Sequence, residues 1–132
     1  MRLTALVMMA AVLTSWAGVP AYAHHSTGLF DSHLIVEISG TVAEFRWLNP
    51  HAAIVIVGTT KDGAQGKWTV EMMAPTAMMD AGWTHDTLAI GDRITVFAHP
   101  LRDPAAANPQ RLLYAGVILP DHRRLGDSDW LR

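Results

Sequence analysis

The stretch LIVEISGTVAEFRW, residues 34–47, determines the fold that the sequence predicts. Its first half alternates with a period of two, and the apolar side chains on one face are Leu34, Val36, Ile38 and Val42. The phase then changes, and the apolar set becomes Ala43, Phe45 and Trp47. A strand changes face only at a bulge or a sharp bend, and Gly40 lies just upstream. The stretch therefore predicts one long, bent first strand.

Two further strands are expected after it. Asn49-Pro50-His51 predicts a turn, because the residue before a proline avoids the helical region and asparagine favours turns. The apolar run AAIVIVG, residues 52–58, predicts a buried strand that ends before the turn signal Asp62-Gly63. KWTVEM, residues 67–72, alternates cleanly, with Trp68 pointing inward.

The pattern then becomes helical and returns to strands. PTAMMDAG, residues 75–82, predicts a short helix that begins near its proline and stops at its glycine. RITVFAH, residues 93–99, and RLLYAGVILP, residues 111–120, predict two more strands, separated by a loop rich in proline and asparagine. In the first of them, Phe97 and His99 are expected to face outward.

The order of elements is three strands, a helix and two strands. This order predicts an all-β fold with one short helix, namely a small OB-fold-like five-stranded barrel spanning residues 34–120. The alternative is an open antiparallel sheet with one covering helix. Residues 24–33 are expected to form an extended N-terminal arm, and residues 121–132 a loosely held C-terminal tail.

Residues 1–23 are interpreted as a cleaved signal peptide. Arg2 supplies the positive start, residues 3–17 are mostly apolar, and Ala21-Tyr22-Ala23 places small residues at the cleavage positions. The alternative is an uncleaved membrane anchor, but the apolar run is shorter than the roughly 20 residues that span a bilayer. We therefore expect a protein of the periplasm or one secreted from the cell, with no stable membrane insertion after processing.

Composition excludes several classes of function. The 10 basic and 12 acidic residues argue against a nucleic-acid-binding protein, which usually carries a clustered basic face. The absence of cysteine excludes disulfides, c-type haem attachment, thiolate iron–sulfur clusters and a blue-copper cysteine ligand. Any bound metal would depend on histidine, methionine, carboxylate and backbone groups.

The motifs AHHS after the leader, GTV with FRWLNPH, W-x-V-E, GW and GDRITV together resemble DUF6152, a family of small exported bacterial proteins. The resemblance spans nearly all of the chain after the leader. It implies export and a compact β-rich domain, and it assigns no reaction. The residues that match the family motifs are His24, His25, Ser26, Asn49, Pro50 and His51.

Cleavage after Ala23 would leave His24 with a free α-amine. That amine and the ring Nδ1 can chelate one metal ion, and another imidazole can complete an all-nitrogen set suited to Cu(II). Deprotonating the amine costs only about 1 kcal/mol at neutral pH. His25 and His51 are the candidate third ligands, followed by His99. The sequence therefore predicts a copper-binding module that sequesters or hands over the metal.

Structural interpretations remain open for these residues. The turn at His51 could use its imidazole only to hydrogen-bond a backbone carbonyl, and the two histidines after the leader could simply be solvated. His85 is interpreted as a loop residue. Core packing is the favoured role for the four clustered methionines and the three central tryptophans, which are Met72, Met73, Met78, Met79, Trp47, Trp68 and Trp83.

A second hypothesis is a non-metal module that binds a small molecule or a protein partner, such as another periplasmic protein, through Arg93, Phe97 and Arg102. An enzyme is not expected. Ser26 beside His25 lacks a triad acid and an oxyanion motif, and there is no phosphate-binding glycine loop or HExxH helix. Glu44 and Glu71 lie on exposed strand faces, and nothing in the sequence marks them as a catalytic pair.

Overall fold

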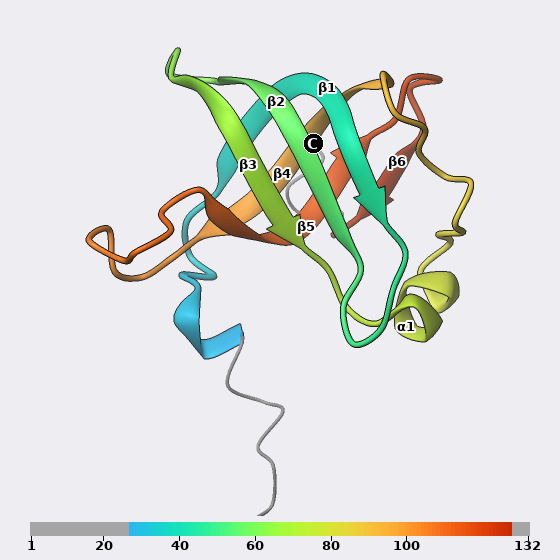
Figure 1. Ribbon diagram of the computed structural model, residues 1–132, viewed down its shortest axis with the longest axis horizontal. Coiled ribbons are helices and arrows are strands. Elements are labelled where there is room, and N and C mark those ends of the chain that lie inside the picture. The colour runs from blue at the N-terminus through green and yellow to red at the C-terminus, as the bar shows by residue number, and fades with distance from the viewer. Residues whose placement is uncertain (1–26, 128–132) are drawn as a thin grey trace, which may run out of the picture.

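The protein was analysed as a computed structural model, which describes residues 27–127. The leader, His24 to Ser26 and residues 128–132 lie outside this range. The elements, shown in Figure 1, are the 3-10 turn η2 (Thr27–Leu29), β1 (Val36–Arg46), β2 (Ala53–Thr60), β3 (Gln65–Glu71), α1 (Pro75–Asp80), β4 (Arg93–Pro100), β5 (Arg111–Ile118) and β6 (Arg124–Gly126).

The first five strands close into a barrel. Their order in the sheet is β3-β2-β1-β4-β5, with antiparallel neighbours throughout. The barrel closes because β3 also pairs with β5 in parallel, with Val70 opposite Leu112. The predicted OB-like barrel is confirmed, and this closure excludes the open sheet that the sequence left as an alternative.

The bulge that the sequence predicted in β1 lies at Ala43. Val42 pairs with Ile56 and Glu44 pairs with Val55, so Ala43 is the extra residue of the bulged strand. The prediction that Ala43 joins the apolar inner face is wrong, because a bulged residue leaves the ladder and this one is exposed. Phe45, beyond the bulge, does pack against the core.

The position of Gly40 suggested that it allows a bend in the strand. The structure gives it a different role. It lies opposite Gly58 of β2, and the two backbones approach so closely that a Cβ on Gly58 would collide with the carbonyl oxygen of Ser39. A Cβ on Gly40 would meet the carbonyl oxygen of Val57 in the same way. The paired glycines therefore allow the β1 and β2 backbones to approach closely at this point of the ladder.

Alternating residues of the strands fill the barrel. Trp68 and Val70 of β3 point inward, as predicted, and so do Ile94, Val96 and Ala98 of β4. Of the adjacent methionines in α1, Met78 is buried and Met79 is exposed. Within residues 27–127, no helix combines the length and apolar character needed to span a bilayer.

The tail begins with structure that the sequence did not predict. Residues 124–126 form β6, a short strand that pairs with the end of β5. The Tyr114 hydroxyl donates to the carbonyl of Leu125 at 2.9 Å, and Asp127 N–H donates to the carbonyl of Ala115 at 2.8 Å. The described part of the tail is therefore held to the barrel, contrary to the loosely held tail that was expected.

Candidate functional site

His51 lies in the β1–β2 loop, immediately after Pro50, whose peptide bond with Asn49 is cis. The next residue anchors the loop, because Ala52 N–H donates to the carbonyl of Met73 at 3.0 Å. The His51 side chain is exposed and makes no hydrogen bond or ion pair with any residue in the described part of the chain. A purely structural role for His51 predicts a hydrogen bond from its imidazole to a backbone carbonyl. No such bond is observed in the described part of the chain.

His99 is held differently. It faces outward from β4, as predicted, and its Nδ1 lies 2.8 Å from the carbonyl oxygen of Leu34. Because that carbonyl can only accept, the Nδ1–H is the donor.

His99 and His51 belong to different parts of the barrel surface. His99 lies opposite Leu113, Leu113 opposite Glu71, and Glu71 opposite Ala53, two residues after His51. Three strand spacings of about 4.8 Å separate His99 from Ala53 along the sheet. Among residues 27–127, no three His, Asp or Glu side chains are grouped so that they could hold a metal ion.

The described part of the arm is folded rather than extended. It starts with the turn η2, and the following residue, Phe30, is only 1% exposed and forms a bridge with Leu101. Hydrogen bonds hold it to the segment after β4. Arg102 donates to the arm twice, from its backbone N–H to the Leu29 carbonyl at 2.9 Å and from its Nε to the Gly28 carbonyl at 3.1 Å. The arm therefore has a fixed course on the barrel.

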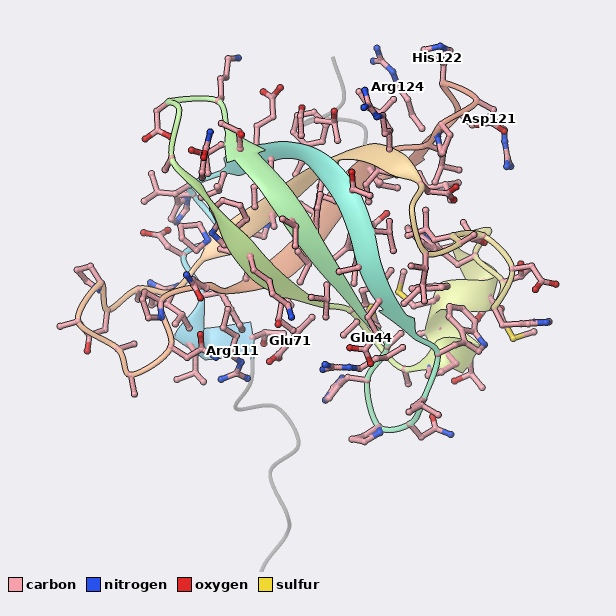
Figure 2. The ribbon with its side chains drawn as sticks, turned by 45° about the horizontal axis from the view of Figure 1, so that its top comes forward. Glu44, Glu71, Arg111, Asp121, His122 and Arg124 are labelled. Atoms are coloured by element: carbon pink, nitrogen blue, oxygen red, sulfur yellow. The ribbon has the colours of Figure 1, made fainter. Side chains whose placement is uncertain are left out.

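That course leads toward the end of β3. The guanidinium carbon of Arg111 lies 5.5 Å from the centroid of the Phe30 ring, and the same guanidinium forms a two-pronged ion pair with Glu71. Figure 2 shows Arg111 and Glu71 next to η2, at the barrel end that also carries the β1–β2 loop. A chain of contacts thus links the arm through Arg111 and Glu71 to Ala53, beside His51.

The two strand-face carboxylates are both paired with arginine. The Glu44 carboxylate accepts hydrogen bonds from Arg46 at 2.7 and 2.9 Å, and these bonds hold the Glu44 pKa below its ordinary value. A general acid needs the opposite, a raised pKa. The hydrogen bond with Glu71 raises the Arg111 pKa. The Glu44 and Glu71 carboxylates are therefore held in fixed ion pairs with arginine.

The residues of the non-metal hypothesis do not share one site. Arg93 and Phe97 project from β4, and seven residue steps of about 3.3 Å separate Arg93 from Pro100 at the other end of that strand. Arg102 lies beyond that end and is bound to the arm at Gly28. A single small ligand cannot contact both arginines.

Most of the methionines and tryptophans have the structural roles that the sequence favoured. Met72 and Met78 are buried, and Trp68 and Trp83 contribute to the core. Trp47 is half-buried and packs against Phe45, with ring centroids 5.7 Å apart. These tryptophans therefore do not form an exposed stacking surface.

The core packing that the sequence favoured for Met73 is wrong, because this residue lies exposed beside the β1–β2 loop. It is 62% exposed, and its carbonyl accepts the hydrogen bond of Ala52. The alternation of side chains along a strand could have predicted this exposure. Met72 points inward at the end of the strand, so its neighbour Met73 is expected to point outward.

The chain matches the model of a family of unknown function, DUF6152, over residues 11–109. The match covers well over half of the chain, so the protein belongs to this family. No curated protein and no solved structure matches it.

Proposed function

We propose that this member of DUF6152 is a small exported module that binds a transition metal, with Cu(II) as the preferred ion. Residues 1–23 serve as the signal peptide, and cleavage after Ala23 frees the α-amine of His24 in the periplasm or outside the cell. The amine and the Nδ1 of His24 chelate the metal, and His51 supplies a third nitrogen. Cu(II) is favoured because it prefers tetragonal nitrogen ligands and heads the general affinity order of divalent ions.

One observation supports this arrangement above the others, namely the course of the arm. Phe30 packs under Arg111, whose partner Glu71 lies opposite Ala53 in the β2–β3 ladder. The arm thereby approaches the barrel end that carries His51. Three Cα–Cα steps separate Thr27 from His24, and they extend the reach of the arm beyond Thr27 by at most about 10 Å.

The state of His51 also supports the proposal. Its imidazole is exposed and has no partner among residues 27–127, so a metal would not have to displace a protein contact. His25 is assigned an assisting role because it adjoins His24. His99 is the weaker candidate, since three strand spacings separate it from Ala53 and its Nδ1 already binds the Leu34 carbonyl.

The proposed role is sequestration or handover, without catalysis. The exposed thioether of Met73 is a soft ligand that suits Cu(I) rather than Cu(II). Its place beside Ala52 would let the same region also hold copper that arrives as Cu(I).

A pair of histidine variants tests the proposal. His51→Ala removes the proposed ligand, whereas His85→Ala removes an exposed imidazole that lies elsewhere, 3.1 Å from the Asp86 carboxylate. Cu(II) titration followed by electron paramagnetic resonance should show at least tenfold weaker binding and the loss of one coupled nitrogen for His51→Ala. His85→Ala should match the wild type. Equal spectra and affinities for the two variants would refute the role of His51.

A further inference from the structure

A groove on the outer surface of the barrel lies away from the β1–β2 loop. It has a volume of about 490 Å³, within the range of small-molecule sites. Its walls come from the middle of β1, the start of β4, the end of β5 and the turn before β6. These segments are distant in sequence, and the ladders from β1 to β4 and from β4 to β5 bring them together.

The polar part of the groove carries positive charge and hydroxyl groups. Arg93 lines it, is exposed, and makes no ion pair or hydrogen bond within residues 27–127. Its partner in the ladder is Thr41, and next to this pair the hydroxyls of Ser39 and Thr95 lie 2.9 Å apart in a hydrogen bond. Each hydroxyl retains further hydrogen-bonding capacity beyond this bond.

No acidic side chain is among the described residues that line the groove. The nearest acidic residue in sequence to the lining residue His122 is Asp121, and Asp121 is already paired with Arg123 at 2.6 Å. An arginine without a carboxylate partner, surrounded by hydroxyl donors, matches the chemistry of an oxyanion.

The groove also has apolar walls. Ile118 and Pro120 line it at the end of β5 and just beyond. The groove thus combines a cationic group with apolar lining. An inorganic anion would use only the first, whereas an organic anion with a short hydrocarbon body would contact both.

His122 supplies a second, independent observation. It lies in the turn between β5 and β6 with φ 67, a left-handed conformation that glycine adopts with least strain. The turn closes through His122 N–H, which donates to the Leu119 carbonyl at 2.9 Å. His122 is one of the residues that line the groove, and its imidazole makes no hydrogen bond or ion pair with the described residues. The turn thus carries a histidine in a left-handed conformation, and its side chain has no partner among residues 27–127.

We propose that this groove binds a small organic carboxylate, with the carboxylate at Arg93 and His122 and the hydrocarbon body against Ile118 and Pro120. The site is separate from the proposed metal site. This proposal revises the non-metal hypothesis. It keeps Arg93, and it replaces Phe97 and Arg102 with His122 and the hydroxyls of Ser39 and Thr95.

The test is a titration of the protein, purified from cells that express the whole chain, with hexanoate and with its uncharged analogue hexanamide. Amide chemical shifts in two-dimensional NMR spectra report binding at each residue. Hexanoate should produce saturable shifts at Arg93, Thr95 and His122, and hexanamide should bind at least tenfold more weakly. Equal binding of the two compounds, or shifts confined to other regions, would overturn the proposal.

Three variants assign the contacts. Arg93→Met should weaken hexanoate binding at least tenfold. Lys67→Met is the matched control, because Lys67 is another exposed cation without an ion pair in the described chain and lies outside the groove. It should leave the affinity unchanged.

The third variant separates binding from folding. His122→Gly relieves the left-handed strain, so the melting temperature should hold or rise while hexanoate affinity falls at least threefold. Full affinity in His122→Gly or in Arg93→Met would contradict the assigned contacts.

Discussion

The guanidinium of Arg111 lies between two segments, with its central carbon 5.5 Å from the Phe30 ring and its nitrogens on the Glu71 carboxylate. The first contact belongs to the arm and the second to the end of β3. A cation that both covers an aromatic ring and forms a two-pronged ion pair connects these segments more firmly than either contact alone. The course of the arm toward the β1–β2 loop depends on this residue.

Replacing Arg111 by methionine should loosen the arm and destabilise the fold. The change keeps much of the aliphatic stem but leaves the Glu71 carboxylate unpaired, so we expect a loss of about 1–2 kcal/mol in the free energy of unfolding. Urea denaturation measures this loss. Hydrogen exchange should also accelerate at the Asp31 amide, which donates to the Pro100 carbonyl at 2.8 Å.

Arg123→Met provides the control for this change. The Arg123–Asp121 ion pair is 66% and 53% exposed, so removing it should leave the free energy of unfolding close to the wild-type value. Equal losses for the two variants would show that Arg111 contributes no more than an ordinary surface cation.

The close approach of β1 and β2 should not tolerate a side chain at Gly58. Alanine there would place a Cβ against the Ser39 carbonyl, and relieving that collision requires the two strands to separate. We expect a destabilisation of about 2–3 kcal/mol, typical of overpacking. Thermal or urea denaturation gives the value.

Gly28→Ala is the matched control, because a Cβ at Gly28 meets no atom within 4 Å. Its unfolding free energy should stay within about 0.5 kcal/mol of the wild type. A Gly58→Ala protein as stable as this control would contradict the close approach of the strands.

Tyr114 should make the fold sensitive to alkali. Burial raises the Tyr114 pKa above its ordinary value of 10.0, and the neighbouring Trp83 opposes this shift only in part. Below pH 10 both the folded and the unfolded chain keep the phenol proton. Above it the unfolded chain releases the proton while the fold retains it, so the free energy of unfolding should fall by up to about 1.4 kcal/mol per pH unit.

Tyr114→Phe removes this dependence while keeping the ring that packs edge-on against Trp83. Urea denaturation of both proteins between pH 9 and pH 11 isolates the phenol, since the lysines are common to both. The variant should show the shallower alkaline slope. Identical slopes would mean that the Tyr114 phenol titrates alike in the folded and unfolded chains.

The sequence predicted the barrel because its strands carry local signals. The change of phase after Val42 located the bulge, and the alternation in residues 67–72 assigned Trp68 to the core. Closure through the parallel pairing of Val70 with Leu112 has no local signal, since it joins strands that the helix and β4 separate. The short strand β6 offers too few residues for a periodicity to be recognised.

The candidate sites could be predicted only in part for the same reason, because contacts between distant residues leave no local signal in the sequence. The burial of Phe30 has no local signal, because its partners, Leu101 and Arg111, are distant in sequence. The groove was missed because Ser39, Arg93 and His122 meet only after β1, β4 and β5 have paired. Arg93 and His51 were proposed as site residues from their chemistry and their place in the sequence, neither of which could show which neighbours each would have.

The amino terminus gives the most direct test of the proposed copper site. The protein processed after Ala23 should be compared with a form that carries one additional alanine before His24, which converts the chelating amine into an amide. Cu(II) titration with electron paramagnetic resonance should give submicromolar affinity and an all-nitrogen spectrum for the first form, and at least tenfold weaker binding for the second. Micromolar or weaker binding that the added alanine leaves unchanged would contradict the account.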